Sequence, residues 1–223
     1  PRGEGGMRAW IDIGVRGSRR ELLRAGLGFG LIGGLAACQL PGSRPPPREF
    51  RLTPKTTFDE LPKVDWSLAI GRPEASPAID TTRIAVVRSG VEIEYYADAR
   101  WVDRPPALLQ PILVQSFRNS GAIAVVGGDR AAFRPDFVLN TDLVTFYALH
   151  GEGSQPEVRV VIASSLIQMP RRNVAGTTEI GRTVAAAGGD LIAVTAAFDD
   201  ALGKVIKRVV EWTLTTGQQA QTS

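Results

Sequence analysis

The chain has 223 residues, of which 43% are hydrophobic and 22% are charged, as in an ordinary globular protein. Its one cysteine cannot form an internal disulfide and its one histidine cannot build a usual zinc site, so redox and metal chemistry are not expected. The net charge is +3, but residues 1–37 hold six arginines against three acidic side chains and carry all of it. The remainder is neutral, which argues against nucleic-acid binding.

Residues 1–37 have the layout of an export signal. A positive segment precedes the apolar run AGLGFGLIGGLAA, residues 25–37, which is too short to span a membrane because a spanning helix needs about 20 residues. The adjacent Arg19 and Arg20, followed by two leucines, resemble the twin-arginine export motif. The alternative is a plain positive segment that uses the general export route. Either way, we expect residues 1–37 to be a signal peptide of the lipoprotein type.

The cysteine lies directly after this segment. LAAC, residues 35–38, resembles the bacterial lipobox, in which the cysteine is acylated and becomes the new N-terminus. Cys38 is therefore the expected lipidation site and membrane anchor. Gln39 in the second position favours the outer membrane, by resemblance to lipoprotein sorting. Residues 38–49 contain three consecutive prolines and are expected to form an extended, semi-rigid tether.

Residues 50–215 combine strand-like and helix-like patterns and are expected to form the folded domain. Short apolar runs flanked by turn residues predict strands at 66–74 and 82–90. The alternation in VEIEYY predicts a half-buried strand at 91–96.

A helix is expected next. Asp103 is a good helix cap, and Pro105 and Pro106 suit a first helical turn. Pro111 cannot donate to the preceding turn, so a bend or a late helix start is expected there, and Gly121 should end the helix. Its apolar face follows from the three- and four-residue spacing of Leu109, Ile112, Leu113, Ser116 and Phe117.

The second half of the chain predicts more strands and a long helix. Residues 122–128 should form a strand, residues 135–170 two long strands around a glycine-containing turn, and residues 171–184 a third. Asp190 is expected to cap a long amphipathic helix, and residues 216–223 are expected to be a disordered tail. The predicted fold class is α+β, a mostly antiparallel sheet with two main helices packed on one face.

No catalytic set is recognisable. His150 lies in a glycine-rich turn without a serine or cysteine partner and is expected to be a surface residue. Five aspartates offer candidates for a general acid and base, but each also suits a cap, a turn or a strand end. No phosphate loop or nucleophile is present, so we expect no enzyme, no cofactor and no metal. The five are Asp80, Asp98, Asp103, Asp136 and Asp142.

The cluster DARWVDRPP is the most marked internal feature. It brings Arg100, Trp101, Asp103 and Arg104 together where a strand meets a helix. One interpretation is a packed tryptophan with an Arg–Asp pair that fixes the start of the helix. The other is a docking surface, because tryptophan and arginine are frequent interface anchors.

Three segments resemble the ABC-type transport auxiliary lipoprotein family, the PqiC-like lipoproteins associated with MCE lipid-transport systems. They are AIDTTRIAVV at 78–87, YYADARWVDRPPALLQPILVQSF at 95–117 and DFVLNTDLVTF at 136–146. FRLTP at 50–54 and AFDDALGKVIKRVVEW at 197–212 extend the resemblance over nearly the whole mature chain. The Arg-Trp-x-Asp core is its most specific part.

This resemblance implies a non-enzymatic lipoprotein on the periplasmic face of the outer membrane of a Gram-negative cell. There it would dock on an MCE-domain protein and, through it, work with an ABC permease and an ATPase to move phospholipid between membranes. An alternative is a periplasmic carrier that holds lipid in its own apolar cavity. An anchored hydrolase is a third and weaker hypothesis.

Overall fold

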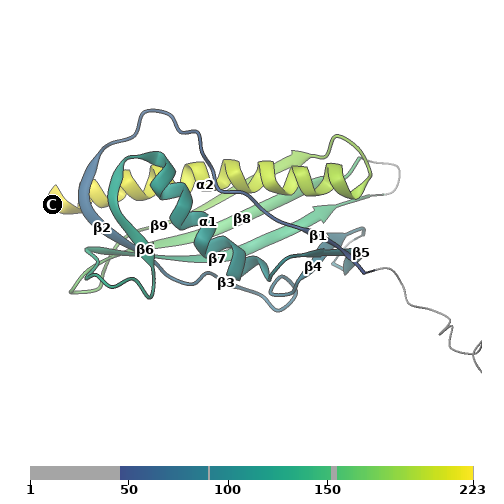
Figure 1. Ribbon diagram of the computed structural model, residues 1–223, viewed down its shortest axis with the longest axis horizontal. Helices are drawn as coiled ribbons and strands as arrows, with labels where there is room; N and C mark the ends of the chain where they lie inside the picture. The colour runs from purple at the N-terminus through teal and green to yellow at the C-terminus, as the bar shows by residue number, and fades with distance from the viewer. Residues whose placement is uncertain (1–45, 90, 152–154, 223) are drawn as a thin grey trace, which may run out of the picture. The chain divides into compact units, whose positions relative to one another are not determined.

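The computed structural model describes residues 46–222, except residue 90 and residues 152–154 (Figure 1). The predicted signal peptide with Arg19 and Arg20, and the lipidation site Cys38, lie outside the described residues. The described part contains two helices and nine strands that join in one sheet, which confirms the α+β class. Neither helix has the length and hydrophobicity that a bilayer span requires.

The three longest strands form an antiparallel meander. They are β7 (Phe137–Leu149), β8 (Glu157–Gln168) and β9 (Asn173–Ala185). In β7 and β8, alternate residues are buried, so each strand has one face on the core. β8 pairs with β7 on one side and with β9 on the other. The predicted hairpin and the third strand are therefore confirmed.

Three short strands pair with the other side of β7, one after another along its length. They are β2 (Val64–Ile70), β3 (Glu74–Ala75) and β4 (Arg83–Val87), and all three run parallel to β7. The strand predicted at 66–74 is thus two strands, because the chain leaves the ladder around Pro73, which has no N–H to donate. The sheet is mixed, with its antiparallel pairing concentrated in the long meander.

The remaining strands flank these short ones. β5 (Ile93–Trp101) pairs antiparallel with β4 and carries β1 (Arg48–Phe50) in parallel on its other side. β6 (Ile123–Gly128) pairs in parallel with β2. The strand predicted at 91–96 exists but is longer, since it continues up to the tryptophan of the DARW sequence.

Helix α1 (Pro105–Ser120) begins without the predicted cap. The N-cap residue is Arg104, which makes no side-chain capping bond, and the Asp103 carboxylate instead accepts the Arg104 N–H at 2.7 Å. The expected late start at Pro111 is also wrong, because the helix begins with the proline pair and passes through Pro111. Gly121 ends the helix with a φ of 63°, as predicted, because glycine adopts this left-handed conformation without strain.

Helix α2 (Leu191–Thr222) is capped as predicted, because Asp190 Oδ1 accepts the N–H groups of Ile192 and Ala193 at 2.8 and 3.0 Å. The prediction of a disordered tail at 216–223 is wrong as far as residue 222. The helix continues there because its inner face stays buried at Gly217.

Both helices cover the same face of the sheet and share one hydrophobic core (Figure 1). At its centre the rings of Trp101, Phe146 and Phe198 contact one another, with centroids 4.8 to 5.5 Å apart. Further along the sheet, the Trp66 ring lies 4.8 Å from that of Phe137. The aromatic side chains thus fill the space between the sheet and α2 at two places.

Candidate functional site

The DARWVDRPP cluster is divided between the core and the surface. Trp101 is only 1% exposed, so it is a core residue and offers no ring to a partner. Arg100 is exposed and pairs with Glu49 on the neighbouring strand, Nη2 to Oε1, at 2.6 Å. Arg104 pairs with Asp80 rather than with Asp103, at 3.6 Å. These pairs tie β1 and the 76–82 loop to the region where α1 begins.

The candidate acid–base residues have separate structural surroundings. Asp136 accepts hydrogen bonds from the backbone N–H and the hydroxyl of Ser67 at 2.8 and 2.7 Å. Asp98 lies in β5 with a φ of 53°, and Asp142 is exposed on β7. His150 is half-buried, and its backbone N–H donates to the Val87 carbonyl at the end of β4.

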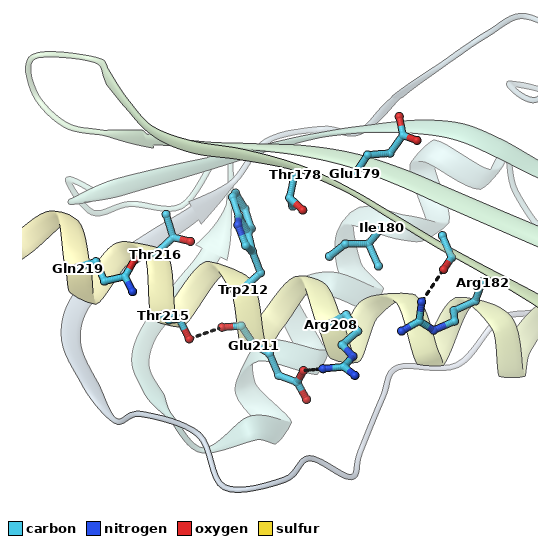
Figure 2. A pocket seen from close by; sticks show the side chains of 11 residues that line it. Thr178, Glu179, Ile180, Arg182, Arg208, Glu211, Trp212, Thr215, Thr216 and Gln219 are labelled. Carbon is cyan, nitrogen blue, oxygen red and sulfur yellow. Dashed lines mark hydrogen bonds and ion pairs between the residues drawn. The ribbon is translucent and has the colours of Figure 1, made fainter.

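A groove of about 670 Å³ runs between β9 and α2 (Figure 2). β9 is an edge strand, since within the described residues it pairs with β8 alone. The strand forms one wall of the groove and the outer side of the helix forms the other. The main side chains are Thr178, Ile180 and Arg182 from β9, and Arg208, Glu211 and Trp212 from α2.

The period of two in β9 explains how the groove is built. Thr178 and Ile180 point toward α2, whereas Glu179 points away (Figure 2). Gly176 allows the close approach of the helix, because a Cβ there would lie only 2.9 Å from a side-chain carbon of Thr216 and 3.4 Å from the Trp212 ring. The strand and the helix therefore lie close together near Gly176, and the groove opens toward Arg182.

The groove combines an apolar floor with a charged rim. Ile180 and Trp212 are partly buried and pack on the core. Arg208 and Glu211 pair across one turn of α2 at 3.0 Å. Arg182 donates from Nη1 to the neighbouring Gly181 carbonyl at 2.7 Å and takes part in none of the ion pairs of the described residues. Such a site suits an extended peptide or another elongated ligand with a carboxylate.

Among the described residues, the two clearly shifted pKa values belong to other contacts. The Lys207 ammonium, 2.6 Å away, lowers the pKa of the Asp59 carboxyl by hydrogen bonding and charge. Burial raises the pKa of the Tyr96 hydroxyl, against a weaker opposing effect of Arg88. Neither group lines the groove. In the described part of the chain, no group of three or more histidine, cysteine and acidic residues is placed to hold a metal.

Sequence reasoning missed this groove. Thr178, Ile180 and Arg182 alternate along β9, but the alternation alone does not indicate which helix covers the strand. Trp212 fits the apolar stripe of α2 equally well as a core residue. Only the pairing of β9 with β8 and the path of α2 bring the two walls together.

A sheet edge beside a groove defines a candidate binding domain, and the comparisons with known proteins place it in a family. The chain belongs to the ABC-type transport auxiliary lipoprotein component family, whose model matches residues 51–210. This family assignment confirms the resemblance recognised in the sequence.

One solved structure supports this family, and a second shares the fold. The crystal structure of protein XCC0632 from Xanthomonas campestris, of the DUF330 family, is similar to 79% of this chain and 99% of its own, with 29% identity and a TM-score of 0.75. A crystal structure of an uncharacterized protein matches 74% of this chain and 97% of its own at 10% identity, with a TM-score of 0.59, which shows the shared fold alone. No curated protein matches the sequence.

Proposed function

We propose that this chain is a non-enzymatic lipoprotein on the periplasmic face of the outer membrane, where it assists an MCE-type ABC system in moving phospholipid between membranes. Its family of transport auxiliary lipoproteins supports this role. The lipobox-like LAAC sequence ending at Cys38, followed by Gln39, supports the anchor and the choice of membrane. The neutral charge of residues 38–223 fits a protein partner better than a nucleic acid.

The observation that carries the docking role is the free edge of β9 beside the groove. Proteins usually protect a long edge strand, because its unpaired N–H and C=O groups pair readily with another chain. β9 has 13 residues and no outer partner in the described part of the chain. We therefore place an extended segment of the MCE-domain protein beside β9, with an acidic side chain of that segment on Arg182.

Reversing the charge of Arg182 should weaken this association. Arg182→Glu should raise the Kd for the purified MCE-domain protein about tenfold, because it replaces a charge-assisted bond with repulsion. The measurement is titration calorimetry, with co-elution as a second readout. Arg159→Glu is the matched control, since Arg159 is exposed on the opposite face of the sheet, on β8. Equal binding by the wild type and Arg182→Glu would contradict docking at the groove.

Removing the cysteine should remove the lipid anchor. Cys38→Ser should abolish labelling by radioactive palmitate, because serine has no thiol to acylate. Gln39→Asp is a useful companion, since it should keep the label and shift the protein toward the inner membrane. Palmitate label on the Cys38→Ser chain would refute the anchor.

The alternative of a lipid carrier has less support. It needs an apolar cavity between the sheet and the helices, and around Trp101 that space is filled by aromatic rings in contact. The groove at β9 is open and has a charged rim instead. Lipid that co-purifies with the protein and is retained in native mass spectrometry would favour the carrier.

A further inference from the structure

One end of the sheet gathers several features that docking at β9 does not use. Ile93, Val87, Leu149, Glu157 and Ala185 are successive partners across five neighbouring strands, so they lie in one row. Helix α2 starts at this end as well, since its first residues follow shortly after β9 (Figure 1). We call this region, from the start of β5 to the start of α2, the tether end of the domain.

The tether end exposes large aliphatic side chains. Val91 is fully exposed, Ile192 is 62% exposed and Ile93 is 39% exposed. Arg88 and Glu94 pair with each other at 3.0 Å, while the exposed Glu92 between Val91 and Ile93 gives the tip a negative charge. Water does not favour such a projecting aliphatic tip, whereas a lipid interface does.

The register of β1 shows in which direction the chain enters the domain. β1 runs parallel to β5, with Arg48 beside Ala99. The start of β1 therefore points in the same direction as the start of β5, where Ile93 lies. Ile93 lies six residues from Ala99, about 20 Å at 3.3 Å per residue. Cys38 lies ten residues before Arg48, about 31 Å as polyproline. A tether of this length, when extended, is therefore long enough for the tether end to touch the bilayer that holds Cys38.

We propose that the tether end rests on the bilayer that holds Cys38, with Val91 and Ile93 inserted at the lipid interface. This inference rests on the lipidation of Cys38 included in the proposed function. The acyl chains retain the protein, and the aliphatic tip fixes its orientation. α2 then extends away from the bilayer, and its C-terminal end, with the adjoining part of the groove, faces the periplasm. Because Glu92 makes the tip acidic, insertion requires no anionic lipid.

Fluorescence on reconstituted protein tests the contact. The only native cysteine is Cys38, so in the acylated protein a new cysteine can be labelled alone with an environment-sensitive nitrobenzoxadiazole dye. Val91→Cys reports the tether end. Val174→Cys is the matched control, an exposed valine at the start of β9 and the opposite end of the sheet. Both proteins are placed in vesicles of phosphatidylethanolamine and phosphatidylglycerol, with and without nitroxide-bearing lipid.

We expect the dye at position 91 to shift to the blue and to lose most of its emission to the nitroxide lipid, while the dye at position 174 keeps its emission in water. Omitting phosphatidylglycerol should not change this result. Equal behaviour of the two positions would overturn the proposal. A blue shift at position 91 without quenching would also overturn it, because another protein chain would then cover the tip. Flotation of the same samples with the vesicles tests the Cys38 anchor separately, so a floating protein with an unquenched tip refutes only the orientation.

Discussion

Replacing Trp101 by alanine should lower the free energy of unfolding by about 3–5 kcal/mol, the usual range for loss of a large buried aromatic. Trp101 is 1% exposed, and its ring contacts Phe146 on β7 and Phe198 on α2. The change therefore opens a cavity between the sheet and the helix. Urea denaturation of the purified chain, followed by circular dichroism, measures it.

The neighbouring Val102 provides the control for Trp101. Val102 is 49% exposed, and Val102→Ala should change the free energy of unfolding by less than about 0.5 kcal/mol. The two substitutions also separate the interpretations of the DARWVDRPP cluster. If Trp101→Ala weakened partner binding and left the stability unchanged, Trp101 would be a docking residue and its buried position here would be contradicted.

Gly217→Ala should destabilise the protein by up to about 2 kcal/mol, although alanine is the better helix former. Helix propensity alone favours alanine by about 1 kcal/mol. However, a Cβ at Gly217 would lie 2.5 Å from Cζ2 of Trp66. Trp66 is 4% exposed and packs on Phe137, so its ring has little room to move. Overpacking of this kind costs about 1–3 kcal/mol and outweighs the propensity.

Gly203 on the same helix is the matched control for this second prediction. A Cβ there would meet only Lys55 Cδ, at 3.7 Å, which is an ordinary contact with a flexible side chain. Gly203→Ala should therefore raise the melting temperature by a few degrees, whereas Gly217→Ala should lower it. Calorimetric scans of the two variants compare the sites directly. An equal rise in melting temperature for both variants would show that the Trp66 ring moves aside to make room for the Cβ.

Local patterns predicted most of the secondary structure. The alternation in β7 and β8 and the cap at Asp190 depend on neighbouring residues, so the sequence reveals them. Asp103 had the right residue type for a cap, but its carboxylate binds the N–H of the next residue, and Arg104 takes the N-cap position. The polar composition after residue 215 suggested disorder. The local sequence cannot show that Gly217 is buried, because its burial depends on a tryptophan about 150 residues earlier.

The site depends even more on distant pairing. Nothing near Arg182 or Trp212 in the sequence indicates that they line one groove, since this depends on how α2 packs against β9 in the folded domain. The sequence also led to Trp101 as a docking candidate, because local reasoning cannot separate a buried anchor from an exposed one. By contrast, the lipobox-like sequence at Cys38 needs no fold to be recognised, which is why it was found from the residues alone.

The parallel strands beside β7 also determine the order in which the chain folds. β2 ends at Ile70, yet its partners β6 and β7 begin only at Ile123 and Phe137. Contacts between such distant segments form late, because long loops must close before pairing is rewarded. During synthesis, β2 therefore remains without a partner until more than fifty further residues have emerged. β4 and β5 form a local antiparallel pair that needs no later strand, whereas β2 joins the sheet only when β6 and β7 have emerged.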